Sequence, residues 1–120
     1  MTDTVDVQAV TIGVGTVVAI LALAYGTLIS ETLLGVATMT IAAVAFAATF
    51  AAVAVLHGAY GRSDMALAHG GAAVGWLLVV FASRALGVVA GLLVLAACGS
   101  YIAVVTIRAR NEQSGDVSGT

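Results

Sequence analysis

Two histidines, His57 and His69, are the side chains in this sequence whose type and spacing best suit chemistry. They flank a short polar stretch that contains glycine, serine and aspartate, so we expect a turn there that brings both imidazoles to one end of the molecule. Two imidazoles at similar depth can ligate a haem iron, contact a quinone or pass a proton. We therefore treat both as candidate cofactor-binding residues. The interpretation that we favour is nevertheless that both are structural and that the protein binds no cofactor.

The other reactive side chains give weaker evidence for a functional site. No charged residue lies in the middle of an apolar run, and Glu31, at the boundary of the first predicted helical hairpin, is the candidate transport residue. A metal site at the histidines would have only Asp64 as a further ligand, so we predict no metal site. Cys98 is the single cysteine, and it has no histidine on its own side of the predicted arrangement to act as a base. We therefore expect no enzymatic activity.

The composition predicts that these side chains belong to a membrane protein. Hydrophobic residues make up 62% of the 120 residues and charged residues only 8%, whereas a soluble domain has about 45–50% and about 25%. The 4 basic and 6 acidic side chains are too few to coat a soluble surface of this size. The high hydrophobic content excludes a disordered chain, and the small number of basic residues excludes a nucleic-acid partner. The expected partner is the lipid bilayer.

The charged residues divide the chain into four apolar runs, each long enough for a spanning helix of about 20 residues. The runs cover residues 9–29, 33–56, 65–83 and 85–107. Residues 1–8 form a polar N-terminal segment, and we expect the polar tail of residues 108–120 to be disordered. The runs do not alternate polar and apolar residues, which argues against outer-membrane strands. The predicted fold is all-α: an integral membrane four-helix bundle with up-down-up-down topology.

The arginines predict the orientation of these helices. Arg62, Arg108 and Arg110 fall on one side of four crossings, and only Arg84 falls on the other. The positive-inside rule then places both termini of a cell-membrane protein in the cytoplasm. Nothing basic precedes the first run, so we expect it to be a helix of the mature protein rather than a signal peptide.

Small residues recur on one face of each run, and such faces let helices approach closely in lipid. The third run also places Trp76 seven residues after His69, which predicts a seam between helices or a pocket on that face. These faces of small residues suit close packing within one bundle, in a homo-oligomer or in a larger membrane complex. The predicted packing residues are Gly15, Ala19, Gly26, Gly71, Gly75, Gly87 and Gly91.

These features favour a small multi-pass membrane protein that acts as a non-enzymatic accessory or structural subunit through helix packing. One alternative is a small oligomeric transporter or channel that uses Glu31 and the two histidines. A further alternative is an electron-transfer subunit in which His57 and His69 bind haem or a quinone.

Overall fold

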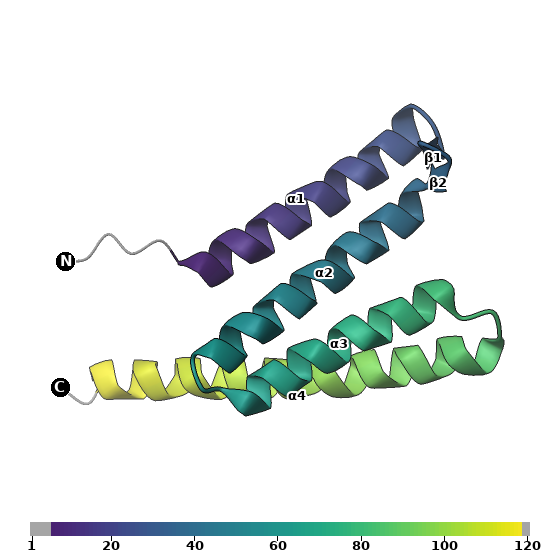
Figure 1. Ribbon diagram of the computed structural model, residues 1–120. Helices are drawn as coiled ribbons and strands as arrows, with labels where there is room; N and C mark the ends of the chain where they lie inside the picture. The colour runs from purple at the N-terminus through teal and green to yellow at the C-terminus, as the bar shows by residue number, and fades with distance from the viewer. Residues whose placement is uncertain (1–5, 119–120) are drawn as a thin grey trace.

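The computed structural model describes residues 6–118 as four helices and one short β-hairpin (Figure 1). The helices are α1 (Val7–Leu28), α2 (Thr38–Ala59), α3 (Ser63–Phe81) and α4 (Ala85–Ser118). The hairpin joins α1 to α2 and consists of β1 (Thr32–Leu33) and β2 (Val36–Ala37). The prediction of an all-helical protein with four long helices is therefore confirmed for this part of the chain.

The start of the second helix was predicted wrongly. We expected it at Leu33, but the chain first forms an antiparallel ladder in which Thr32 faces Ala37 and Leu33 faces Val36. Leu34 and Gly35 make the two-residue turn with φ angles of 52° and 79°, the signs that a right-handed hairpin twist requires. A short apolar run does not distinguish a strand from a helix by its periodicity, which explains the error.

The end of the fourth helix also differs from the expectation. We expected a disordered tail from Arg108, but α4 continues to Ser118. The residues after Arg108 include Ala109, Glu112 and Gln113, which have good helix propensity, and no proline interrupts them. At 1.5 Å per residue, the polar part of α4 adds about 16 Å to the helix.

The first helix begins inside the predicted polar N-terminal segment. Residues 1–5 of that segment lie outside the described residues. Asp6 caps α1, since its side chain accepts a hydrogen bond of 3.1 Å from the backbone N–H of Ala9. Val7 and Gln8 are already helical, so the polar character of this segment does not delay the helix.

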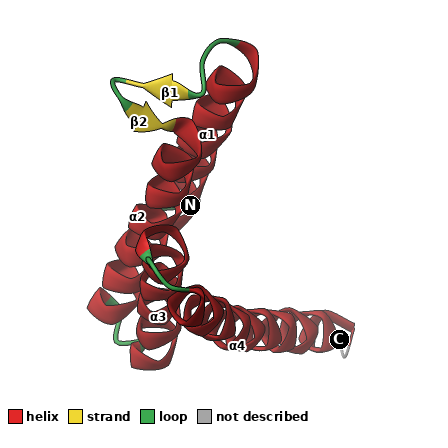
Figure 2. Ribbon diagram, turned by 90° about the vertical axis from the view of Figure 1, so that its right-hand side faces the viewer, coloured by secondary structure: helices red, strands yellow, loops and turns green. Residues whose placement is uncertain are grey.

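Each helix packs mainly on its neighbours in the chain, and the first and last helices do not close the group into a compact bundle. Each helix turns back along its predecessor, so α1 packs on α2, α2 on α3 and α3 on α4 (Figure 1). Viewed from the side, α4 leads away from the α1–α2 pair (Figure 2). The radius of gyration is 17.0 Å, whereas a compact chain of this length has about 14 Å. The accessible surface is 8120 Å², against about 6,000 Å² for a compact protein of this mass. The helices α1 and α4 are thus edge helices with one main neighbour each.

The buried core is built from small side chains. Ala19 and Ala22 of α1 meet Ala42 of α2, and all three are at most 8% exposed. Phe46 packs against this cluster from α2. Small core residues bring helix backbones close together, which is how helices associate where apolar burial supplies no driving force.

Candidate functional site

The facing sides of α2 and α3 carry the two candidate histidines, His57 and His69. Each helix contributes four side chains at intervals of four, three and four residues, so each set forms a stripe along one face. Because the helices run in opposite directions, the two stripes meet along their length (Figure 1). The stripes are Phe46, Phe50, Val53 and His57 on α2, and Met65, His69, Ala72 and Trp76 on α3.

Ring contacts hold these two stripes together. Phe46 stacks on Trp76, with ring centroids 5.4 Å apart and planes 17° apart. Next along the seam, Phe50 and His69 have centroids 5.9 Å apart. The centroids of His57 and His69 are 4.9 Å apart with a tilt of 37°. The face that Trp76 shares with His69 is therefore a seam between helices.

The two histidines form a buried pair beside the α2–α3 turn. Each is 6% exposed. Nδ1 of His69 lies 2.9 Å from the carbonyl oxygen of Met65. Because a carbonyl only accepts, Nδ1 carries the hydrogen and Nε2 of a neutral His69 ring presents a lone pair. Nε2 of His57 is buried without a hydrogen-bond partner among the described residues. A buried polar atom left unpaired lowers the stability of the folded state by about 1–3 kcal/mol. Nε2 of His57 is therefore the atom of the pair that most needs an explanation.

The spacing of the pair bears on which cofactor it can hold. Two histidines on opposite sides of a haem iron, with metal–nitrogen bonds of about 2 Å, have ring centroids about 6 Å apart with the haem plane between them. The observed 4.9 Å leaves no room for that plane. Residues 6–118 contain no group of three or more His, Cys, Asp or Glu side chains that would hold a metal ion. The geometry therefore favours direct contact between the imidazoles over haem ligation.

Glu31 lies at the other end of α2 from the histidines. Its backbone carbonyl accepts hydrogen bonds from the backbone N–H of Thr38 at 2.9 Å and from the Thr38 hydroxyl at 3.1 Å. Its side chain is exposed. The 19 helical steps from Thr38 to His57 span about 28 Å. The structure thus brings the two histidines together but does not bring Glu31 to them.

The predicted packing residues of α1 lie against α2. A Cβ atom at Gly15 would overlap the hydroxyl of Thr49, and one at Gly26 would overlap the hydroxyl of Thr38. Ala19, between these glycines, is fully buried. The glycines therefore accommodate threonine side chains that project from α2.

The two GxxxG pairs lie on the α3–α4 side. A Cβ at Gly91 would lie 2.8 Å from the carbonyl oxygen of Gly75, and one at Gly75 would lie 3.1 Å from the carbonyl oxygen of Gly91. A Cβ at Gly71 would lie 2.6 Å from Sγ of Cys98. Gly87 is close to Ala82 in the preceding turn. Both GxxxG pairs thus serve contacts within the chain and are not free to pair with a second copy.

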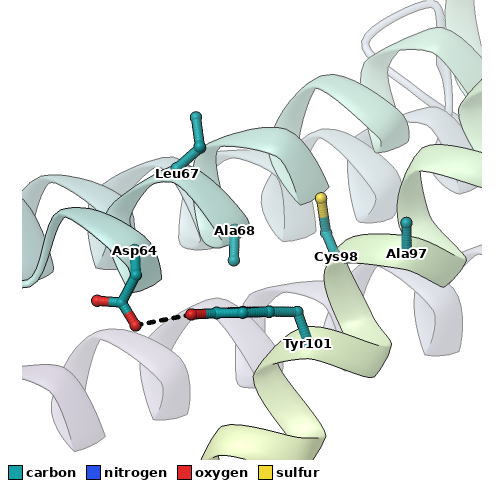
Figure 3. A pocket seen from close by; sticks show the side chains of 6 residues that line it. All are labelled: Asp64, Leu67, Ala68, Ala97, Cys98 and Tyr101. Atoms are coloured by element: carbon teal, nitrogen blue, oxygen red, sulfur yellow. Dashed lines mark hydrogen bonds between the residues drawn. The ribbon is translucent and has the colours of Figure 1, made fainter.

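A groove between α3 and α4 was not predicted. It has a volume of about 350 Å³ and is bordered by a hydrogen bond of 3.0 Å from the Tyr101 hydroxyl to Oδ2 of Asp64 (Figure 3). The signal in the sequence was Tyr101 itself, because a polar group among apolar residues of a spanning helix requires a partner. The partner was not identifiable until the register of α3 against α4 was known.

The outer face of α4 is a second surface that the sequence analysis did not predict. A Cβ at Gly99 would meet nothing within 4 Å. Ala96, Ser100 and Ala103 near it are exposed. This face lies roughly a third of a turn around the helix from Gly91 and the other α3 contacts, at 3.6 residues per turn. It has the same small-residue spacing as the faces that pack inside the chain.

The fold and these surfaces define a class of protein. All four helices, among residues 6–118, are long and apolar enough to span a membrane, as in a small multi-pass membrane protein. Comparisons with protein families, with curated proteins and with solved structures found no match to this chain.

Proposed function

We propose that this chain is an integral membrane protein that acts as a non-enzymatic accessory or structural subunit, with the outer face of α4 packed against a helix of another chain. In this arrangement the four helices cross the bilayer up-down-up-down. The excess of arginine near the α2–α3 turn and at the start of the polar part of α4 then favours a cytoplasmic position for both termini.

The free small-residue face around Gly99 is the observation that carries this proposal. Ala96, Gly99 and Ala103 recur at intervals of three and four residues on an edge helix that packs mainly on α3. In lipid, helices associate through close packing of such residues, since lipid chains are as apolar as leucine. The comparable face of α1 at Gly15 is filled by Thr49 of α2. An α4 face of the same kind that has no partner among residues 6–118 suits a helix from another chain.

A pair of glycine substitutions tests this function. Gly99→Leu fills the proposed contact face with a bulky side chain that lipid accepts readily. Gly13→Leu is the matched control, because Gly13 is also exposed on an edge helix and a Cβ there also meets open space. We expect native electrophoresis of mildly solubilised membranes to show a complex in the wild type and in Gly13→Leu, and a shift to free subunit in Gly99→Leu. A wild type that migrates only as a monomer contradicts the proposal, as does an unchanged complex in Gly99→Leu.

The unpaired Nε2 of His57 supports a second candidate, a subunit that contacts a quinone through the histidine pair. A quinone carbonyl would accept a hydrogen bond from this nitrogen when it carries the proton. Solvent extraction of the purified protein and absorption spectroscopy would then detect quinone in the wild type but not in His57→Ala. A wild-type extract whose absorption spectrum contains no quinone rejects this candidate. The same spectrum would reveal a haem, which the ring spacing disfavours.

The transporter alternative has less support from the geometry. Glu31 and the histidine pair lie at opposite ends of α2, and small, apolar residues fill the core between α1 and α2. Liposome flux that falls in Glu31→Gln would restore this alternative, and an unchanged basal leak would remove it.

A further inference from the structure

The groove between α3 and α4 combines apolar walls with one charged end. Its volume of about 350 Å³ lies in the range of about 300–1,000 Å³ that small-molecule sites occupy. Tyr101 extends from α4 toward Asp64, while Ala97 and Cys98 lie about one helical turn before Tyr101 on α4 (Figure 3). The residues that line it are Asp64, Leu67, Ala68, Ala97, Cys98 and Tyr101.

The charge at the end of this groove is only partly compensated by its surroundings within residues 6–118. The Asp64 carboxylate accepts a hydrogen bond of 3.0 Å from the Tyr101 hydroxyl. The exposed Arg62 attracts this carboxylate over a longer distance, but no basic side chain in the described part of the chain forms an ion pair with it. Asp64 is the one charged residue that lines the groove. A cation at this position gains a charge-assisted hydrogen bond, and the Tyr101 ring offers a second attraction for an ammonium group.

We propose that this groove binds a hydrophobic ammonium ion, with its nitrogen on Asp64 and its apolar body along Ala68, Ala97 and Cys98. The orientation agrees with the predicted membrane boundary. Asp64 lies in the first turn of α3, so the charged head sits near the polar end of the helix and the apolar body points toward the middle of the span. This site lies on a different face from the α4 contact of the proposed subunit function and is independent of it.

The single cysteine provides a direct reporter of occupancy. Cys98 lines the groove and is partly exposed. A bound ligand should therefore slow its reaction with a maleimide. The probe is dodecylammonium, and dodecanol is the neutral control with the same chain. With purified full-length protein in mild detergent, we expect dodecylammonium to slow labelling at least fivefold at saturation and dodecanol to have little effect.

Two carboxylate substitutions then separate charge recognition from simple partition into an apolar groove. Asp64→Asn should abolish protection by dodecylammonium. Asp116→Asn makes the same chemical change on the exposed end of α4 and should leave the protection intact. Circular dichroism checks that both variants keep the helical content of the wild type. Equal protection by dodecanol, or protection that persists in Asp64→Asn, overturns the proposal.

A second measurement covers the case in which Cys98 proves unreactive. A ligand that binds the folded state raises the melting temperature, so dodecylammonium should stabilise the wild type and Asp116→Asn more than dodecanol does. It should not do so in Asp64→Asn. An absence of selective stabilisation, together with an absence of protection, contradicts the proposal.

Discussion

The contact between Gly91 and Gly75 predicts that one substitution has opposite effects at two sites on α4. A methyl group at Gly91 would lie 2.8 Å from the carbonyl oxygen of Gly75 and 2.9 Å from side-chain atoms of Leu78 and Val79. Ordinary contacts of this kind begin at 3.4 Å. A methyl group at Gly99 would meet nothing within 4 Å.

The magnitudes follow from these distances. Overpacking against backbone and side chains costs about 1–3 kcal/mol, while alanine gains up to about 1 kcal/mol over glycine inside a helix. Gly91→Ala should therefore lower the free energy of unfolding by up to about 2 kcal/mol, which is the upper end of the overpacking cost less the gain in helix propensity. Gly99→Ala has only the gain in helix propensity and should raise the free energy of unfolding by up to about 1 kcal/mol.

Reversible unfolding in mixed micelles, followed by far-ultraviolet circular dichroism as the share of denaturing detergent rises, measures both values. Fluorescence of Trp76, which stacks on Phe46, gives an independent signal from the α2–α3 seam. Equal stabilisation by Gly91→Ala and Gly99→Ala would refute the close approach of α3 and α4 and the register built on it.

Three further predictions concern the hairpin and the seam. Leu34→Asn should stabilise the protein by about 0.5–1 kcal/mol, because asparagine tolerates the positive φ of 52° better than leucine; unchanged unfolding would argue against this turn. A double-mutant cycle of Phe46→Ala and Trp76→Ala should give a coupling energy of about 0.5–1.5 kcal/mol, and additive effects would mean that the rings do not stack. His57→Leu should raise the free energy of unfolding by about 1 kcal/mol in ligand-free protein, because it removes the buried unpaired nitrogen; a loss of stability would show that this nitrogen has a partner.

The four apolar runs were readable from the sequence because charged residues lie at their ends or outside them. The polar stretch after His57 predicted the turn, and a turn of that length brings His57 and His69 close. The GxxxG pairs were recognisable by spacing alone, although their partners within the chain were not. Whether Gly75 faces Gly91 or another molecule depends on how the third and fourth helices cross.

The remaining features depend on tertiary register or on weak local preferences. The hairpin was missed because leucine at a left-handed position is unusual and the five residues around it are nearly all apolar. Asp64 and Tyr101 are 37 residues apart, and their contact follows from the close approach at Gly91. The outer face of α4 was hidden in the sequence because its small residues share a helix with those that contact α3.

A photo-cross-linker beside Gly99 tests the central claim most directly. A benzophenone maleimide attached to Ser100→Cys, at the edge of the outer face of α4, leaves Gly99 itself unchanged. In a Cys98→Ser background, and activated in native membranes, it should join the chain to a second polypeptide. The same reagent on Gly13→Cys in that background should give no polypeptide adduct. Adducts with lipid only at position 100, or equal polypeptide adducts at both positions, would contradict a protein partner on the outer face of α4.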